Sequence, residues 1–508
     1  MKKRLSTLLF LFGFYAAIHT QTLLNSRHIN PDHGNPNYGS LCQQVERTPS
    51  GKIFVYGTYD EFSDNFEGLL ANAAGNRRFI AAYQPNGQIE WVRGVSDETS
   101  YRTWMSYAPA GGHLYWASDF TGLLHIGTDI MSTTDIDESI VIGRYDTSGN
   151  YQNAFVIGSI NTYERVKDIA SDANGNVVVL LTTNAVGTYL GLNLQPALDA
   201  PVSMILARYT PGGTLLSAAL VGASQYDFGQ FSLAPAPSGD WYVGGSMFSG
   251  KVVLAGTEIP EIGSGILRWN LNAGLVWVSP VLSVYNNCQI YDIASDQAGN
   301  VAFAGSFIGQ LQAGNPRSKS GYNIDVLVGK MDAAGQILWS RNGDDGSNFS
   351  ETAYGVTTDA DGNVYITGGC KGGLVFENGG VCDNGPYSVS FIARFNADGG
   401  YAWANCNGSG TGIDLVVEPD QTIFATGTTA NGVGASNTNY LNHWANYDLS
   451  VQALPKTRYC TGDTIPLYWN VEGTTYPAGS SVQVSILDSS AIVYTFNYQS
   501  TGGSSGVV

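Results

Sequence analysis

The chain has 508 residues, of which 24 are Lys or Arg and 42 are Asp or Glu, so its formal net charge is −18. A surface this acidic repels the phosphates of DNA and RNA, which argues against a nucleic-acid partner. Charged residues make up only 13% of the chain, whereas the 63 Gly and 29 Tyr are abundant. This composition is typical of an all-β protein and not of a disordered one.

The N-terminus has the features of a secretory signal. Residues 2–4 are basic and precede an apolar run from Leu8 to Ile18, which is too short to span a bilayer. We therefore predict a signal peptide over residues 1–20. No later apolar run is long enough to form a transmembrane segment, so we expect a protein that is secreted or exposed at the cell surface.

The next part of the chain repeats itself about every sixty residues, which indicates a repeat architecture. A strand–turn–strand pattern occurs seven times: VERTPSGKIFVYGTY (45–59), SYAPAGGHLYWASDF (106–120), DIASDANGNVVVLLT (168–182), SLAPAPSGDWYVGGS (232–246), DIASDQAGNVAFAGS (292–306), GVTTDADGNVYITGG (355–369) and, without the glycine, DLVVEPDQTIFATGT (414–428). A second hairpin pattern, such as VLVGKMDAAGQILWSRNG (326–343), follows six of these copies. Two hairpins give four strands per repeat, the content of one β-propeller blade. The sequence thus predicts a seven-bladed β-propeller over residues 21–455.

Two neighbouring stretches carry a family resemblance: IDVLVGKMDAAGQILWSRNGDD (324–345) and GDDGSNFSETAYGVTTDADGNVYITGG (343–369). They resemble the seven-bladed propeller repeats of proteins exported by bacteria, often of the Bacteroidetes type. The resemblance covers nearly all of 21–455 and is strongest in the fifth and sixth copies. It implies a secreted or surface protein, and it implies no shared catalytic residues.

The sixth copy raises the question of a calcium site. Asp359, Asp361 and Asn363 alternate around Gly362, as oxygen ligands do in a calcium loop. In five of the six other copies the Gly stays while the acidic residues change, and TPSGK in the first copy has no carboxylate at all. A tight turn needs only the Gly, preceded by Asp, Asn or Ser. We therefore expect a turn, with these three residues as weak metal candidates and no other cofactor.

A Trp recurs near the end of several repeats, at Trp91, Trp277, Trp339 and Trp403. Sialidase-like propellers and quinone-dependent dehydrogenase propellers carry related Asp–Gly–Trp patterns, but neither spacing matches this chain. The simpler interpretation is a large side chain on the last strand of each blade that packs against the next blade.

Two cysteines, Cys370 and Cys382, bracket a loop excursion of the sixth repeat. In an oxidising compartment they could close this loop as a disulfide. The sequence offers no partner for the other four cysteines.

Closure of the ring requires a strand from the N-terminal end. The segment 22–46 has the order of a last strand followed by a first strand, and the seventh copy lacks a second hairpin. We therefore predict that residues 23–28 form the outer strand of the seventh blade, because pairing removes the open edges of a linear array.

The repeat stops after residue 455. DTIPLYWNVEG, SSVQVSILD and AIVYTFNY then read as three strands, and they resemble the start of an Ig-like module. An Ig-like sandwich needs about seven strands in about 100 residues, so 456–508 is predicted to be an incomplete Ig-like domain and the chain the N-terminal part of a longer protein.

For function, the repeats and the absence of a nucleophile motif favour a non-catalytic scaffold that binds a protein or glycan outside the cell. The alternative is a polysaccharide-active enzyme, a glycoside hydrolase or lyase, with carboxylates on one propeller face. The scaffold reading predicts that no cluster combines paired carboxylates, a shifted pKa and a deep pocket.

Overall fold

The structure of the chain is a computed structural model. It describes residues 18–29, 41–58, 65–66, 69–70, 78–96, 103–133, 138–195, 201–226, 228–246, 252–255, 257–259, 264–281, 288–309, 324–344, 350–371, 374–376, 379–381, 388–419, 421–430, 437–451, 468–472, 481–488, 491–499 and 505–507. The chain divides into two compact units, residues 26–417 with 424–442 and residues 1–25 with 418–423 and 443–508. The larger unit contains the blades.

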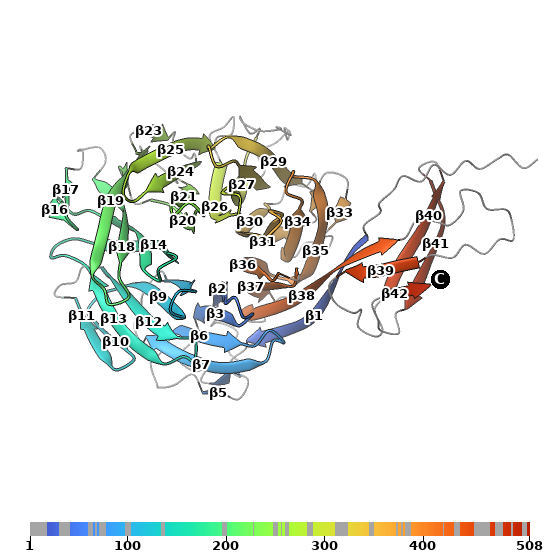
Figure 1. Cartoon of the computed structure of the whole chain (residues 1–508), viewed down its shortest axis with the longest axis horizontal. Coiled ribbons are helices and arrows are strands. Elements are labelled where there is room, and N and C mark those ends of the chain that lie inside the picture. Colours follow the sequence, from blue (N-terminus) through green and yellow to red (C-terminus); the bar gives the residue numbers. More distant parts are fainter. Residues whose placement is uncertain are drawn as a thin grey trace, which may run out of the picture. The chain divides into compact units, whose positions relative to one another are not determined.

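Six antiparallel sheets share one pattern of four strands, listed here from the innermost to the outermost strand (Figure 1). Blade 1 contains β2 (Leu41–Arg47), β3 (Ile53–Thr58), β6 (Arg78–Tyr83) and β7 (Ile89–Ser96), and blade 2 contains β8 (Thr103–Ala108), β9 (His113–Phe120), β12 (Ser139–Asp146) and β13 (Tyr151–Ile157). Blade 3 contains β14 (Glu164–Ser171), β15 (Val177–Thr183), β18 (Val202–Tyr209) and β19 (Leu215–Ser224), and blade 4 contains β20 (Phe231–Pro235), β21 (Trp241–Ser246), β24 (Ser264–Asn270) and β25 (Gly274–Val281). Blade 5 contains β26 (Cys288–Ser295), β27 (Val301–Phe307), β28 (Asp325–Met331) and β29 (Ile337–Asp344), and blade 6 contains β30 (Thr352–Thr358), β31 (Val364–Lys371), β34 (Ser388–Phe395) and β35 (Tyr401–Ser409). This all-β arrangement of four-stranded blades is a β-propeller.

The number of regular blades is six, one fewer than the sequence predicted. The seventh repeat forms β36 (Thr411–Val417) and β37 (Ile423–Ala430), but these strands belong to a larger, six-stranded sheet. Its order continues through β38 (Asn437–Val451), β39 (Tyr468–Glu472) and β42 (Ser505–Val507), and β1 (Ile18–Ile29) pairs with β38. The degenerate copy therefore does not end in the hairpin that completes the other blades.

Short hairpins connect the second and third strands of several blades, and the sequence analysis did not identify them. They are β4 (Asn65–Phe66) with β5 (Leu69–Leu70), β10 (Leu123–Ile126) with β11 (Asp129–Ser132), β16 (Gly187–Tyr189) with β17 (Leu192–Leu194), β22 (Val252–Leu254) with β23 (Thr257–Ile259), and β32 (Val375–Phe376) with β33 (Gly379–Val381). Two of them extend the preceding blade, because β22 pairs with β19 and β32 pairs with β29. They cover outer edges that would otherwise be unpaired.

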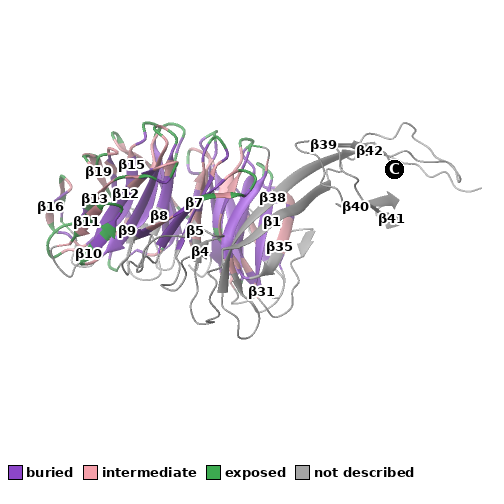
Figure 2. Cartoon of the chain, turned by 90° about the horizontal axis from the view of Figure 1, so that it is seen from below, coloured by how far each residue is buried: buried purple, intermediate pink, exposed green. Residues whose placement is uncertain are grey.

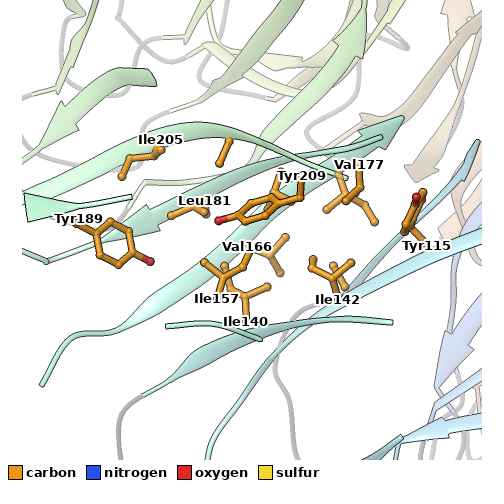
Figure 3. Close-up of a cluster of buried hydrophobic side chains, with 14 of the residues drawn as sticks. Tyr115, Ile140, Ile142, Ile157, Val166, Val177, Leu181, Tyr189, Ile205 and Tyr209 are labelled. Atoms are coloured by element: carbon orange, nitrogen blue, oxygen red, sulfur yellow. The ribbon is translucent and has the colours of Figure 1, made fainter. Parts of the chain in front are cut away.

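The burial of each strand follows its position in the blade (Figure 2). The middle strands are buried along their whole length, as in β15 and β27, because both faces of a blade pack against neighbouring blades, and this gives continuous apolar runs. The outermost strands are only partly buried, as in β13 and β25. Figure 3 shows the cluster between blades 2 and 3, where Ile140 and Ile142 meet Val166, Leu181 and Tyr209.

The C-terminal region contains the three strands that the sequence predicted. They are β39, β40 (Ser481–Asp488) and β41 (Ala491–Gln499). β40 and β41 form a two-stranded sheet, while β39 pairs with β38, with Asp448 opposite Glu472. The Ig-like sandwich stays a prediction. Among the described residues no helix is long and apolar enough to cross a membrane.

Candidate functional site

The calcium-like motif of the sixth repeat forms a turn. Gly362 has a φ of 78°, the left-handed conformation that Gly adopts without strain. The Asp359 carboxylate is used within the turn: Oδ1 accepts the N–H groups of Asp361 (3.0 Å) and Asn363 (2.9 Å), and Oδ2 accepts Asn363 Nδ2 (2.8 Å) and Tyr365 Oη (3.0 Å). No group of three or more His, Cys, Asp or Glu within the described ranges could hold a metal ion.

The recurring Trp residues link neighbouring blades, as the simpler interpretation predicted. The indole Nε1 atoms of Trp91, Trp277 and Trp339 donate to carbonyl oxygens in the second hairpin turn of the following blade. The distances are 3.2 Å to Thr147, 2.9 Å to Ala333 and 2.9 Å to Ala397. Each ring also packs on the turn glycine of that hairpin, Gly149, Gly335 or Gly399, where a Cβ atom would overlap the indole. These aromatics therefore have a structural role.

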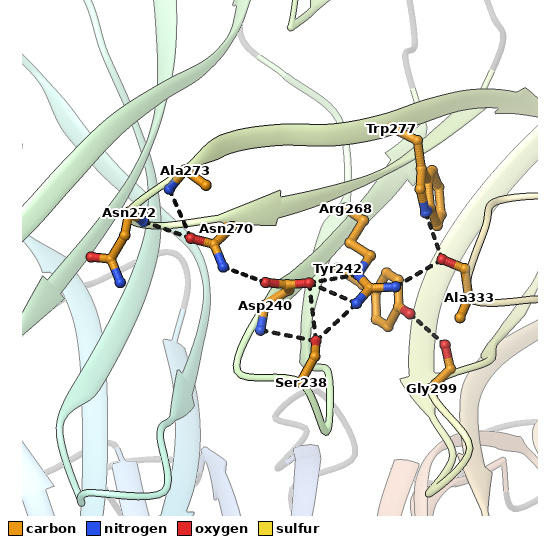
Figure 4. A network of polar contacts seen from close by, with 10 residues as sticks. All are labelled: Ser238, Asp240, Tyr242, Arg268, Asn270, Asn272, Ala273, Trp277, Gly299 and Ala333. Carbon is orange, nitrogen blue, oxygen red and sulfur yellow. Dashed lines mark hydrogen bonds and ion pairs between the residues drawn. The ribbon is translucent and has the colours of Figure 1, made fainter.

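A polar network joins blades 4 and 5 (Figure 4). Arg268 donates through Nε to Asp240 Oδ2 (2.8 Å) and through Nη1 to the carbonyl oxygen of Ala333 (2.8 Å). Its guanidinium lies over the ring of Tyr242, with 5.8 Å between Cζ and the ring centroid, and the Tyr242 hydroxyl donates to the carbonyl of Gly299. The repeat thus places charged and aromatic side chains at the seams between blades.

The innermost strands carry bulges that the sequence analysis missed. The strand register shifts between Cys42 and Gln44 in β2, between Val166 and Asp168 in β14, between Ile290 and Asp292 in β26, and between Ala353 and Gly355 in β30. A bulge adds one residue to the strand and re-aims the side chain that follows it. In these four repeats the residue after the extra position lies seven before the turn glycine, whereas β8 and β20 pair with the next strand without a register shift.

Side chains at this repeat position bond to the backbone of the next innermost strand. Asp168 Oδ2 accepts the N–H of Leu233 in β20 (2.7 Å), and Asp292 Oδ2 accepts that of Val356 in β30 (2.8 Å). Asp414 Oδ2, in β36, accepts the N–H of Val45 in β2 (2.8 Å). Gln44 Oε1 accepts the N–H of Met105 in β8 (2.5 Å). These four side chains each span a seam between neighbouring repeats.

Carboxyl groups on these strands have raised pKa values. Burial raises the pKa of Asp168 to about 8, of Asp414 to about 7 and of Asp292 to about 6. Burial also raises the pKa of Glu46 in β2 well above its usual range, and the charges of Asp414 and Asp168 add to this shift. The accepted backbone N–H groups oppose these shifts without cancelling them. Shifted pKa values therefore occur on these strands, whereas the prediction that no cluster combines paired carboxylates, a shifted pKa and a deep pocket stays a prediction.

The sequence contained a signal for these residues. The copies DIASDANGN, DIASDQAGN and DLVVEPDQT all begin with the Asp in question, in the third, fifth and seventh repeats. The second, fourth and sixth copies lack this Asp and still form the turn, so the turn does not need it. An acidic residue that recurs on an otherwise apolar innermost strand requires a partner, and this partner is the backbone of the next blade.

The outermost strands carry exposed aliphatic side chains. Leu275 and Val276 in β25 are 41% and 48% exposed, and Leu338 in β29 is 52% exposed. Val156 in β13 and Leu216 and Leu220 in β19 are also exposed. Half of the twelve exposed large hydrophobic residues in the described part of the chain thus lie on four consecutive outer strands, those of blades 2 to 5.

The cysteines differ from the sequence prediction. Cys370 carries a buried thiol, whose Sγ lies 3.6 Å from the carbonyl oxygen of Val389 and donates to it. The predicted disulfide between Cys370 and Cys382 is therefore wrong, and Cys382 lies outside the described residues. Cys406 in β35 is disulfide-bonded, although the sequence suggested no partner for it.

Comparisons with known proteins find distant structural similarities and no family. No family model and no curated protein matches this chain. Among solved structures, the chain is similar to the WD40 β-propeller domain of Doa1, with 9% identity, 84% of this chain and 97% of that chain covered, and a TM-score of 0.44. It is also similar to a protein of unknown function from Dyadobacter fermentans (11% identity, 84% and 99% covered, TM-score 0.39) and to the α-L-arabinofuranosidase Arb93A from Fusarium graminearum (9% identity, 83% and 97% covered, TM-score 0.39).

Proposed function

We propose that the seventh repeat closes the propeller ring as a seventh blade, built from β36, β37, β38 and β1. The innermost strand β36 contacts both β30 of blade 6 and β2 of blade 1, and the strand order from β36 through β37 and β38 to β1 is that of a blade. The hydrogen bond from Val45 to Asp414 lies at this seam and joins residues 369 positions apart. The N-terminal strand β1 includes residues 23–28, the segment expected to complete this blade.

The closed ring is a frame and not a reaction centre, because the recurring polar residues bond to the protein itself. The Asp of the turns binds its own turn, the Trp and Arg268 side chains bind the next hairpin, and the inner carboxyls accept backbone N–H groups. A function grafted onto such a frame belongs to residues outside the repeat pattern.

The protein is a non-catalytic scaffold that binds another protein, exported to the cell surface or beyond. The observation that carries this proposal is the run of exposed aliphatic side chains on β13, β19, β25 and β29. These side chains recur on the outer strands of four blades, and exposed apolar side chains can mark a surface at which a partner binds. Aliphatic groups favour a protein partner over a glycan, since sugar rings stack preferentially on aromatic faces. The signal-like N-terminus supports export.

The test uses photo-crosslinking at the outer strands. A benzophenone amino acid replaces Val276 in the full chain, and a matched chain carries it at Val186, which is 71% exposed but lies outside the outer strands. The producing cells are illuminated, and the adduct specific to position 276 is identified and purified. Val276→Asp should weaken its binding by about tenfold or more, as a central apolar contact does, whereas Val186→Asp should leave it unchanged.

Two outcomes would contradict this proposal. Equal effects of the two aspartate substitutions would remove the outer strands from binding. Hydrolysis or lysis of a polysaccharide by the purified chain, abolished by a single substitution at Asp168, Asp292, Asp414 or Glu46, would instead support the enzyme alternative, in which paired carboxyls act as acid and base.

A further inference from the structure

The outermost strand of each blade has one edge that faces away from the blade. Such an edge pairs readily with another chain unless charged residues, proline or a covering segment protect it. β7 contains Glu90 and Arg93, β29 contains Arg341, and β25 contains Pro280, which has no N–H to donate. The outermost strands of the other three blades, β13, β19 and β35, contain neither a charged residue nor a proline.

β19 is the longest of these three strands, and part of its edge is already paired. β22 pairs with residues 222–224 of β19, and Ala255, which directly follows β22, donates its N–H to the carbonyl oxygen of Val221 (2.9 Å). No other described strand pairs with residues 215–220 on the side away from β18. This stretch, the open edge of β19, is therefore continuous with an edge that accepts a strand.

The strands that the chain adds to its own outer edges indicate what such an edge accepts. β22 pairs with β19 and β32 pairs with β29, both in the antiparallel direction. Each places a large, fully buried apolar side chain over a glycine of the outer strand. Leu254 lies 3.1 Å from the position of a Cβ atom on Gly222, and Phe376 lies 2.7 Å from that of Gly343. An accepted segment is thus extended and apolar, with bulky side chains beside small residues.

The open edge has the same combination of small and apolar residues. Ser217, Ala218 and Ala219 lie at its centre, between Leu216 and Leu220. The two leucines are 45% and 42% exposed. Ala218 and Leu220 share one face of the strand, because side chains alternate between the two faces. An added strand places its own side chains beside them as cross-strand pairs, the contacts that stabilise a sheet.

We propose that the partner protein binds at the open edge of β19 by adding an extended segment as a further antiparallel strand. The segment has aliphatic residues at alternate positions and Lys or Arg at its ends, because a chain with a net charge of −18 attracts basic residues. Main-chain hydrogen bonds provide affinity in this mode, and the alternate side chains provide specificity. The same net charge disfavours a second copy of this chain as the occupant. This inference rests on the proposed function, since it describes how the proposed partner binds.

The test uses a fluorescent synthetic peptide, Lys-Lys-Leu-Thr-Leu-Thr-Leu-Lys-Lys, and measures its fluorescence anisotropy with the full chain. A second peptide is N-methylated at its Leu and Thr nitrogens, so it keeps every side chain and loses the main-chain donors. We expect the first peptide to bind and the N-methylated one to bind at least about tenfold more weakly, because the added strand depends on main-chain hydrogen bonds.

Two variants of the full chain locate the peptide. Leu220→Lys places a charge on the open edge and should weaken binding by about tenfold or more. Leu123→Lys is the matched control, because Leu123 is 50% exposed but lies in β10, outside the outermost strands, and it should leave binding unchanged. In the unsubstituted chain, the peptide should also slow hydrogen exchange of amides within residues 215–220 and leave those of β7 unchanged.

Several results would overturn the inference. These are equal binding of the two peptides, equal binding to Leu220→Lys and the unsubstituted chain, or no slowing of exchange within residues 215–220. Dimers of the chain that Leu220→Lys abolishes would identify a second copy as the occupant and would overturn it as well. If any of these results appears while Val276→Asp still weakens binding of the crosslinked partner, the inference fails and the proposed function stands.

Discussion

Lys330→Met is the substitution for which the seam contacts predict the largest effect from a single side chain. Lys330 lies in β28 and is only 2% exposed; its Nζ is 2.7 Å from Asp296 Oδ2 in the first turn of blade 5 and donates to the Gly362 carbonyl of blade 6 at 2.6 Å. Asp296 is 3% exposed at its side chain. Met has a similar aliphatic length, so the change removes the charge and keeps most of the packing.

The magnitude follows from what remains around Asp296. Breaking a buried ion pair by removing one partner costs about 3–5 kcal/mol, because the other charge stays buried. Asp296 keeps two donors, the N–H and Nδ2 of Asn300, both at 2.8 Å, and the expected loss is therefore about 3 kcal/mol, the lower end of that range. Lys52→Met is the matched control, since the Lys52–Glu90 pair is about a quarter exposed and should contribute less than about 1 kcal/mol.

Urea unfolding at pH 7 measures both variants, with the double variant Lys330→Met/Asp296→Asn as a third sample. Asparagine leaves no uncompensated charge, so the double variant should be more stable than Lys330→Met alone. Equal losses of stability in Lys330→Met and Lys52→Met would refute the reasoning about the buried pair. A double variant that is less stable than Lys330→Met would refute it as well.

Three further predictions concern the other seams. Trp339→Phe should cost about 1 kcal/mol more than Trp403→Phe in thermal or urea unfolding, because Trp339 donates to Ala397, whereas the buried Nε1 of Trp403 has no hydrogen-bond partner within the part of the chain described; equal costs would contradict this. Gly305→Ala should cost about 3 kcal/mol, because its Cβ would lie 1.8 Å from the Gln289 carbonyl oxygen. Gly239→Ala has a positive φ of 85° but open space around its Cβ, so it should cost about 1 kcal/mol. A lower urea midpoint for Gly239→Ala than for Gly305→Ala would contradict this. Peptide mapping without reduction should join Cys406 to Cys382, since Cys382 directly follows β33 and β33 contacts β35; a Cys370 disulfide in the map would show this assignment to be wrong.

The sequence predicted the repeat and the turns because both depend on local residues. In most of the hairpin turns a glycine donates its N–H to the carbonyl of the residue three before it, and an apolar run lies on either side of the turn, so one copy can be recognised without the others. Gly362 and Asp359 were assigned to a turn on this basis, and the Trp residues to blade packing.

The contacts between blades could not be predicted from the sequence in the same way. Asp168 accepts a hydrogen bond from the backbone N–H of Leu233, 65 residues away. Every residue except Pro has a backbone N–H, so the sequence does not indicate which residue is the donor. The thiol of Cys370 depends on a strand register that places it opposite Val389 in β34. The seventh copy also shows the limit of local reasoning, because its strands belong to a six-stranded sheet that includes β38 and β1, which come from opposite ends of the chain.

Hydrogen exchange at the Val45 amide tests ring closure most directly, because its acceptor, Asp414, belongs to the last repeat. In the full chain at pH 5 the amide should be protected as strongly as that of Leu233. Asp414→Ala should remove this protection and leave Leu233, whose acceptor is Asp168, unchanged. A Val45 amide that exchanges at the unprotected rate in the unsubstituted chain, or one that Asp414→Ala does not affect, would contradict a ring closed between the first and last repeats.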